Sequence, residues 1–433
     1  MKKAIVFGDG ISGKGATLLL KELGYNVLLV DDKTAMKSTD AIKEIEGTDL
    51  FVKSPGIPYT ELVKEAFRKN VEVIDEIELA YRYLKKNNLK AKIVTITGTN
   101  GKSTTTAKIA ELICDAGYKA IACGNIGKSM AETIYENQNI DYLVLEASSF
   151  QLENIKEFTP YISMIINLGP DHIERYNSFD EYYDTKFNIC KNCDKKSYFI
   201  ENIDDENIVK RENLIPCKKI SLSKNKMADI HINENNIVFR NEKIINIDEL
   251  ALKGRHNLEN CMFMIATAKL IGIDNNVIAN FLKNAKPLEH RTENFYNWGK
   301  VKFINDSKAT NVDSANVAID SYPGCTLICG GYDKKVDLLP LVNNIIKNVK
   351  EVYLIGTIAD QLNNLLIENG FDKNHIYLCR DVETTLKNIK NRLTENEERI
   401  ILFSPATSSY DQFKSFEHRG KVFKKLVLEI FGG

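Results

Sequence analysis

Glycine, lysine and hydroxyl residues gather at one point of the chain in the order typical of a phosphate-binding loop. Residues 95–104 read TITGTNGKST, and the GKS at Gly101–Ser103 matches the end of the P-loop pattern G-x-x-x-x-G-K-[ST]. That pattern requires a further glycine where this chain has Ile96, and the nearest glycine is Gly98. The stretch therefore predicts a variant phosphate loop, with a plain glycine turn as the alternative.

The flanks of this loop predict a strand-to-helix turn. Lys92–Thr97 is an apolar, β-branched run typical of a buried strand, and the apolar residues of Lys102–Gly117 have helical spacing. Backbone amides and the helix dipole at such a turn attract an anion. Lysine would reach the terminal phosphates, and a hydroxyl would bind Mg²⁺. The residues expected to hold the nucleotide are Gly98, Thr99, Asn100, Gly101, Lys102, Ser103 and Thr104.

Ionisable residues follow two more predicted strands. Glu146 ends the run that starts at Tyr142, and GPDHIERY, which contains Asp171 and His172, follows the run Tyr161–Asn167. Ligands of parallel sheets bind at the carboxyl ends of strands, where a carboxylate can hold Mg²⁺. The alternatives are a solvated carboxylate and a structural histidine.

Four polar clusters in the last third of the chain also lie beside or follow predicted strands. The first contains His290 and Arg291, and the other three are NDSKATN from Asn305, GGYDKKVD from Gly330 and SPATSSYDQFKSFEHRG from Ser404. Their common position predicts one face used as a binding site.

Short apolar runs alternate with helical patterns along the whole chain, which predicts parallel sheets with helical crossovers. We expect an α/β protein of three domains, each with a largely parallel sheet flanked by helices. The expected domains are a Rossmann-like domain (1–90), a P-loop-type central ATPase domain (91–287) and a Rossmann-like C-terminal domain (288–433).

Composition excludes several classes of protein. The 433 residues carry 58 basic and 59 acidic side chains, a net charge of −1, so binding to nucleic acid or to a membrane surface is not expected. No apolar run approaches the ~18 residues of a membrane span. Nine scattered cysteines indicate free thiols in a cytoplasmic protein, and the lone C-x-x-C of Cys190 and Cys193 is expected to be structural or incidental and not a zinc site.

The loop TGTNGKST resembles the ATP loop of the Mur ligases, cytoplasmic enzymes that build the peptide stem of peptidoglycan, whose relatives include folylpolyglutamate synthetases. EASSFQLE, from Glu146, is similar to the stretch found in members that add D-glutamate to UDP-N-acetylmuramoyl-L-alanine. The resemblance spans the chain and implies an ATP-dependent, amide-forming ligase that works through an acyl phosphate. Small molecules would be its partners, and we expect a monomer.

The resemblance also implies a nucleotide and metal site. Two Mg²⁺ ions would be held by Ser103, Glu146, His172 and Lys186, with Lys186 carbamylated by CO₂. The residue pattern alone would make Lys186 a surface lysine. Asn257, and through the same motif Asn260, would meet the adenine or its ribose. The residues expected to act in catalysis are Lys102, Glu146, His172, Lys186 and Arg291, the last on the γ-phosphate, while Asp306 would hold the ribose.

The substrate residues are likewise implied by the resemblance. The UDP-linked substrate would contact Ser12, Asp31, Asp32, Gly56 and Asn125, and the acceptor region and D-glutamate would contact Lys308, Thr310, Lys334, Ser409 and Phe416. Lys335 is an alternative to Lys334, and Tyr410 and the pair Asp32-Lys33 depart from the usual family pattern. Taken alone, GDGISGKG from Gly8 and the later Asp31 would instead suggest an NAD-dependent oxidoreductase.

Overall fold

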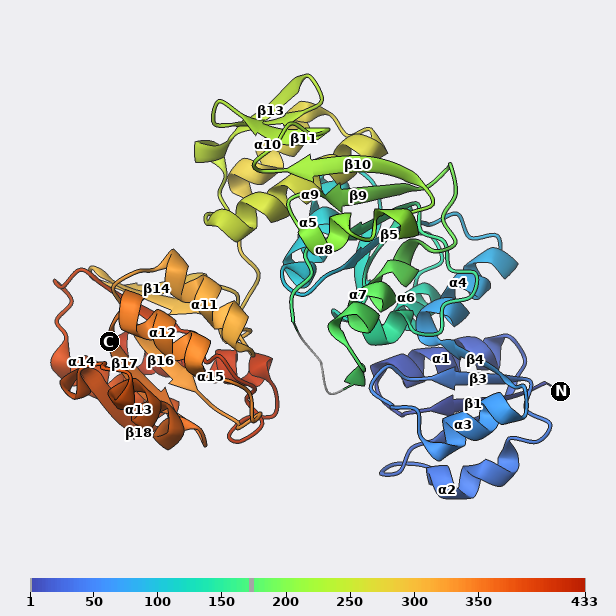
Figure 1. The fold of residues 1–433 in the computed structure, drawn as a ribbon, viewed down its shortest axis with the longest axis horizontal. Helices are drawn as coiled ribbons and strands as arrows, with labels where there is room; N and C mark the ends of the chain where they lie inside the picture. Colours follow the sequence, from blue (N-terminus) through green and yellow to red (C-terminus); the bar gives the residue numbers. More distant parts are fainter. Residues whose placement is uncertain (1, 171–174, 433) are drawn as a thin grey trace. The chain divides into compact units, whose positions relative to one another are not determined.

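The computed structural model describes residues 2–170 and 175–432. Contacts divide the chain into two compact units, Met1–Ala285 and Lys286–Gly433 (Figure 1). Three separate sheets, all parallel or mainly parallel and flanked by helices, confirm the α/β class. The three domain boundaries stay a prediction. Within the described residues, no helix is both long and apolar enough to cross a membrane.

The first sheet is wholly parallel, with the order β2-β1-β3-β4. β1, β3 and β4 are mostly buried, as expected of a parallel sheet, whereas the edge strand β2 is only partly buried. The elements are β1 (Lys3–Phe7), α1 (Ile11–Glu22), β2 (Asn26–Val30), α2 (Ser38–Ala41), β3 (Leu50–Lys53), α3 (Glu61–Arg68), β4 (Glu72–Asp75) and α4 (Glu76–Lys86).

The second sheet has nine strands in the order β13-β12-β11-β10-β9-β8-β5-β7-β6. Its strands are β5 (Lys92–Thr97), β6 (Ala120–Gly124), β7 (Tyr142–Glu146), β8 (Ile162–Ile165), β9 (Tyr198–Asn202), β10 (Lys218–Ser223), β11 (Ile230–Asn233), β12 (Asn236–Phe239) and β13 (Glu242–Asn246). β12 pairs in the antiparallel sense with both β11 and β13, and the other strand pairs are parallel. Its helices are α5 (Lys102–Asp115), α6 (Met130–Glu136), α7 (Phe179–Phe187), α8 (Glu206–Val209), α9 (Arg255–Ile271) and α10 (Asn275–Asn284).

The third sheet has the order β14-β15-β19-β16-β17-β18, with β14 as an antiparallel edge. Its strands are β14 (Glu293–Trp298), β15 (Val301–Asn305), β16 (Cys325–Gly330), β17 (Val349–Ile355), β18 (Ile376–Arg380) and β19 (Arg399–Phe403). Its helices are α11 (Val312–Ser321), α12 (Leu339–Asn348), α13 (Ala359–Glu368), α14 (Val382–Arg392) and α15 (Phe416–Phe431).

The strand order of the second sheet brings three predicted site loops to one edge. β5 pairs with β7 on one side, Ile96 facing Glu146, and with β8 on the other side, Thr97 facing Ile165. All three strands are parallel, so the loops that follow them emerge together at their carboxyl ends.

Candidate functional site

The phosphate loop is held by an asparagine that follows β8. The Oδ1 of Asn167 accepts hydrogen bonds from the backbone N–H groups of Thr99 (3.2 Å) and Asn100 (2.8 Å). Its Nδ2 donates to the carbonyl of Asn100 at 3.2 Å. Gly98 has φ +147° and Gly101, which precedes α5, has φ +86°, a region that side chains disfavour. The variant loop therefore uses glycine where its backbone turns.

Two lysines converge on this loop. The Nζ of Lys102 donates to the carbonyls of Gly98 and Thr99, both at 2.8 Å. The Nζ of Lys186, on α7, donates to the same Gly98 carbonyl at 3.2 Å. The structure thus brings Lys186 to the phosphate loop, 84 positions along the chain from Lys102.

Lys186 lies on a buried face of α7 and is only 2% exposed, so the surface position that its sequence pattern suggests is wrong. Tyr182 precedes it by four residues, which places both on one side of a helix. The Lys186 Nζ lies 4.6 Å from the centroid of the Tyr182 ring. Burying an ammonium costs free energy. The buried position of Lys186 at the phosphate loop therefore favours a role in the site.

Glu146 lies at the end of β7 and is 2% exposed. Its Oε1 accepts a hydrogen bond from Asn125 Nδ2 at 3.0 Å, while its Oε2 is buried with no hydrogen-bond partner among the described residues. A buried carboxylate oxygen in this condition suits a bound cation, so the residues present fit Mg²⁺. The expected ligand His172 lies outside the described residues. Ser103 is buried at the start of α5.

The start of α9 is connected to the phosphate loop through amide side chains. Asn260 Nδ2 donates to Asn257 Oδ1 at 3.4 Å, and Asn260 Oδ1 accepts from Thr105 Oγ1 at 3.2 Å. Lys253, whose carbonyl accepts a hydrogen bond from Asn257 Nδ2 at 2.8 Å, lines a pocket of about 300 Å³ together with residues that include Leu250, Arg255 and Leu258. Aliphatic side chains beside polar groups are suited to a flat heterocyclic ring.

The predicted nucleotide-substrate residues of the first sheet are arranged around β1 and β2. The carboxylate of Asp31 accepts backbone hydrogen bonds from Asp9, Lys33 and Thr34 at 3.0–3.1 Å. These bonds, that from Asp9 above all, lower the pKa of Asp31 to about 2. This carboxylate therefore holds the loop that follows β2 next to Asp9.

The remaining substrate candidates of the first unit lie at loop and helix ends. Asp32 accepts hydrogen bonds from the backbone N–H and hydroxyl of Ser38. Ser12 is in the first turn of α1, and Gly56 is exposed in the loop after β3.

In the second unit, Asp306 follows β15 and is buried. Burial raises its pKa to about 7, although Ser404 Oγ (2.7 Å), the Thr292 N–H (3.1 Å) and the nearby Arg291 favour the ionised form. Arg291 lies in a tight turn between His290 (φ +64°) and Thr292 (φ +41°). Asp306 thus shares a small region with Arg291, at the start of NDSKATN.

The predicted D-glutamate residues also lie within this unit. The Lys308 Nζ lies 3.8 Å from the centroid of the Phe416 ring, and Lys334 Nζ donates to the Thr310 carbonyl at 3.1 Å. Ser409 is buried, with 2% of its surface exposed. This contact joins the loop of Lys334 to that of Thr310, and the choice between Lys334 and Lys335 stays a prediction.

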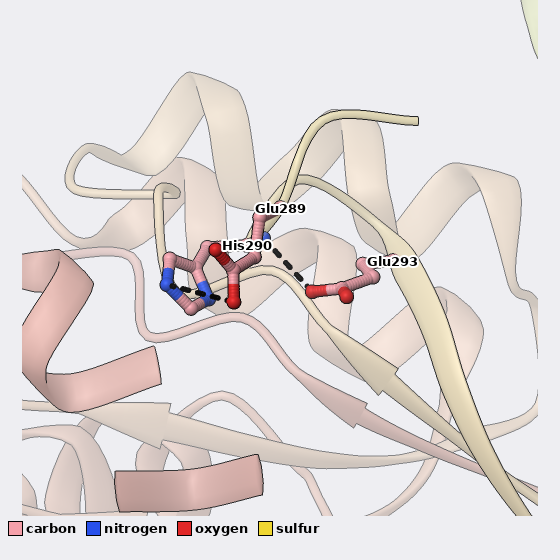
Figure 2. A group of neighbouring side chains, drawn as sticks. All are labelled: Glu289, His290 and Glu293. Carbon is pink, nitrogen blue, oxygen red and sulfur yellow. Dashed lines mark hydrogen bonds and ion pairs between the residues drawn. The ribbon is translucent and has the colours of Figure 1, made fainter. Parts of the chain in front are cut away.

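A second group of possible metal ligands lies beside Arg291. The side chains of Glu289, His290 and Glu293 offer ligand atoms that all lie within 4.8 Å of one another (Figure 2). However, Lys424 Nζ donates to Glu289 Oε1 (3.1 Å) and to Glu293 Oε1 (2.7 Å). Asn305 Nδ2 donates to His290 Nδ1 at 2.8 Å, and burial lowers the pKa of His290. One ammonium therefore already bridges the two carboxylates and offsets part of their charge. Cys190 and Cys193 are buried free thiols, which agrees with their expected structural role.

Sequence reasoning missed Asn167, because an asparagine after a strand usually indicates only a turn. Asn167 lies near the carboxyl end of β8, and this position could have indicated a role in the site. The sequence does not show that β8 lies next to β5, so the signal could not be used.

Comparisons with known proteins agree with this geometry. Residues 96–268 match the family described as Mur ligase middle domain. The chain is 56% identical over 432 residues to the UDP-N-acetylmuramoylalanine–D-glutamate ligase of Fusobacterium nucleatum subsp. nucleatum, with 100% of both chains covered. It is 36% identical to the ligase of the same name from Thermoanaerobacter sp. (strain X514), covering 99% of this chain and 98% of the relative.

Solved structures of lower identity show the same fold. UDP-N-acetylmuramate-alanine ligase from Thermotoga maritima superposes with a TM-score of 0.63 at 16% identity, covering 99% of both chains. A pseudomurein peptide ligase type C from Methanothermus fervidus gives 0.59 at 17% identity, covering 98% of this chain and 100% of that structure.

Proposed function

This chain belongs to the Mur ligase family, and from that premise we infer that it is an ATP-dependent ligase joining D-glutamate to UDP-N-acetylmuramoyl-L-alanine. The reaction would belong to the synthesis of peptidoglycan precursors. The inference rests first on a relative of that name that matches this chain along its whole length. It rests also on the position of Lys102, Lys186 and Glu146 at one edge of the second sheet.

The chemistry begins with an unreactive carboxylate, whose negative charge repels an amine. Transfer of the γ-phosphoryl group of ATP to the muramoyl-L-alanine carboxylate gives an acyl phosphate and ADP. The D-glutamate amine then attacks the acyl carbon, a C–N bond forms, and phosphate leaves with the C–O bonding electrons. Lys102 would stabilise the charge on the transferring phosphoryl group, and loop amides held by Asn167 would orient the phosphates.

We further propose that the site takes two Mg²⁺ ions and that Lys186 is carbamylated. When bound, Mg²⁺ supplies positive charge next to the phosphate oxygens. Glu146, with its buried Oε2, is one ligand, and Ser103 and His172 are others. Addition of CO₂ to the neutral amine of Lys186, with loss of one proton, gives an anionic carbamate, which turns a cation into an oxygen ligand. The fit of a long side chain beside the Gly98 carbonyl supports this role. A monomer in the cytoplasm stays our expectation.

Product analysis tests the function. Purified protein is incubated with UDP-N-acetylmuramoyl-L-alanine, ATP, Mg²⁺ and one amino acid at a time, and the nucleotide-linked products are separated by mass. We expect a new amide only with D-glutamate, and one ADP for each amide formed. Release of ADP from ATP alone at the same rate would contradict the acyl-phosphate scheme, and preference for L-glutamate on a folate substrate would identify a folylpolyglutamate synthetase.

A further inference from the structure

A buried charged group connects the loop after β3 with the segment after β7. Lys53, the last residue of β3, is fully buried at 0% exposure. Its Nζ lies 3.3 Å from Glu153 Oε2 and donates to the Ile57 carbonyl at 3.2 Å. Burying an ammonium is costly unless an opposite charge compensates it. Glu153 is the nearer of two carboxylates that compensate Lys53; Asp75 Oδ1 lies 4.0 Å from the same Nζ.

Arg175 binds the same carboxylate from a third segment. Its Nε and Nη2 donate to the two oxygens of Glu153 at 3.2 and 3.0 Å, the paired geometry that guanidinium favours. Its Nη1 donates to the Pro55 carbonyl at 2.7 Å, and Nη2 also donates to the Ile57 carbonyl at 3.2 Å. The guanidinium carbon lies 4.1 Å from the centroid of the Phe150 ring. The Arg175 side chain thus hydrogen-bonds to the loop on both sides of Gly56.

The segment that carries Glu153 is held in place by side-chain hydrogen bonds. It follows Glu146 through a short 3-10 turn (η2, Ser149–Leu152), where the Ser148 and Gln151 side chains form a capping box. Asn188 Nδ2 also donates to the Leu152 carbonyl at 2.9 Å. Glu153 is therefore a firm anchor, placed seven residues after the proposed metal ligand.

We propose that Arg175 and Glu153 are positioning residues that hold loop 54–58 in the shape that receives the nucleotide part of the muramoyl substrate. This rests on the proposed function, in which Gly56 contacts that substrate. Arginine is required because one planar group must donate to a carboxylate and to two carbonyls together. A lysine in its place keeps the charge but has one compact ammonium, which cannot reproduce that fork.

The chain offers a matched control in Arg82. Its Nε donates to Glu78 Oε1 at 2.8 Å, and Glu78 accepts the backbone N–H groups of Lys156, Glu157 and Phe158 at 2.9–3.0 Å. Arg82 thus also supports a carboxylate that joins α4 to the segment following Glu153. Among the described residues, the hydrogen bonds and ion pairs of Arg82 go to Glu72, Glu78 and Glu157, none of which belongs to loop 54–58. Arg82→Lys consequently disturbs comparable ion pairing without touching the substrate loop.

The test compares Arg175→Lys, Glu153→Gln and Arg82→Lys in the full chain. Calorimetry measures binding of UDP-N-acetylmuramoyl-L-alanine and of ADP, and hydrogen exchange reports on residues 54–58. For Arg175→Lys we expect about tenfold weaker binding of the muramoyl nucleotide, ADP binding within about twofold, and faster exchange in the loop. Arg82→Lys should lower the melting temperature without these changes. The double variant Arg175→Lys/Glu153→Gln should lose less than the sum of the single losses, because both remove one contact.

Wild-type binding and exchange in Arg175→Lys would overturn the proposal, and so would an equal loss for both nucleotides. The outcome is separable from that of the proposed function. If the wild type binds the muramoyl nucleotide but joins no D-glutamate to it, the proposed function fails, while binding and exchange still decide the role of Arg175. If the wild type does not bind it, unchanged loop exchange in Arg175→Lys rejects the positioning role as well.

Discussion

The charged cluster around Gly98 and the cluster around Lys424 differ in whether their carboxylates are paired with donors from the protein itself. At the first, Glu146 Oε2 is buried without a hydrogen-bond partner among the described residues, and Lys102 and Lys186 donate to one carbonyl. At the second, one ammonium contacts two carboxylates at 3.1 and 2.7 Å. Folded chains rarely leave buried polar atoms unsatisfied without a reason. His290 Nε2 in the second cluster is also buried without a hydrogen-bond partner among the described residues, so the contrast lies in the carboxylates. Oε2 of Glu146 has no donor, which indicates a ligand site, whereas Glu289 and Glu293 both accept from Lys424, which indicates a stabilising role.

The largest effect should come from Lys102→Ala. The Lys102 ammonium would stabilise the negative charge on the transferring phosphoryl group. Without it, D-glutamate-dependent ADP release should fall by about 10³-fold or more. Lys108→Ala is the control, because Lys108 lies on the same helix but pairs with Glu111. An equal fall in both variants would contradict a role specific to the phosphate loop.

Lys186→Ala should reduce activity almost as far, because the proposed carbamate is lost. Short carboxylic acids that fit the vacated space should restore part of the activity, measured again as ADP release. The same acids should not rescue Lys102→Ala, which lacks a cation and not an anion. Absence of rescue, together with an unmodified mass for wild-type Lys186, would remove the carbamate from the mechanism.

Glu146→Gln should act through the metal. A neutral amide binds Mg²⁺ more weakly than a carboxylate, so the Mg²⁺ concentration for half-maximal activity should rise about 10–100-fold. Asn125→Ala, which removes the hydrogen bond to the other oxygen of Glu146, should give a smaller rise. An unchanged Mg²⁺ requirement in Glu146→Gln would exclude this residue as a ligand.

Asp306→Asn should change the pH dependence of stability. The carboxyl titrates near its ordinary value of 3.8 in the unfolded chain and near 7 in the folded one. The folded state therefore holds the extra proton between these values, so this group makes the unfolding free energy fall as pH rises through that window, with no further loss above about 7. The melting temperature of Asp306→Asn relative to the wild type should rise from pH 5 to about pH 7. Parallel curves would show that Asp306 is not titrating there.

The smallest effect is expected of Lys424→Met. Its loss leaves Glu289 and Glu293 close together without their cation, so the melting temperature should fall by ~2–4 °C, about 1 kcal/mol. Activity at saturating substrates and the Mg²⁺ requirement should not change. A Mg²⁺-dependent recovery of stability in wild-type protein would instead make this cluster a metal site and remove the contrast with Glu146.

The strands that carry the site were predictable because they are apolar, β-branched runs that end in polar residues. Lys92–Thr97 and Tyr142–Glu146 occur in the structure with the predicted bounds. The central region of the chain is harder to predict. Its nine-stranded sheet depends on pairings between distant segments, which local pattern does not contain.

The partners of the site residues were harder to predict. The resemblance placed Lys186 in the site, but the residue pattern did not, although its spacing of four from Tyr182 on a helix was a signal. Arg175 and Glu153 looked like ordinary charged residues. Their role depends on contacts with Pro55 and Ile57, more than 90 positions away in the chain, which become visible only in the fold.

The side chain of Asn167 has a consequence for the sheet as a whole. Its amide carries a carbonyl and an N–H in the arrangement of a peptide bond, and it uses both against the loop after β5. The Asn167 side chain therefore adds one more pair of hydrogen bonds, a further rung of the ladder, beyond the last backbone pair of β5 and β8. Aspartate would set an oxygen against the Asn100 carbonyl, and glutamine would overshoot by one methylene. Few substitutions at this position should leave the rung intact.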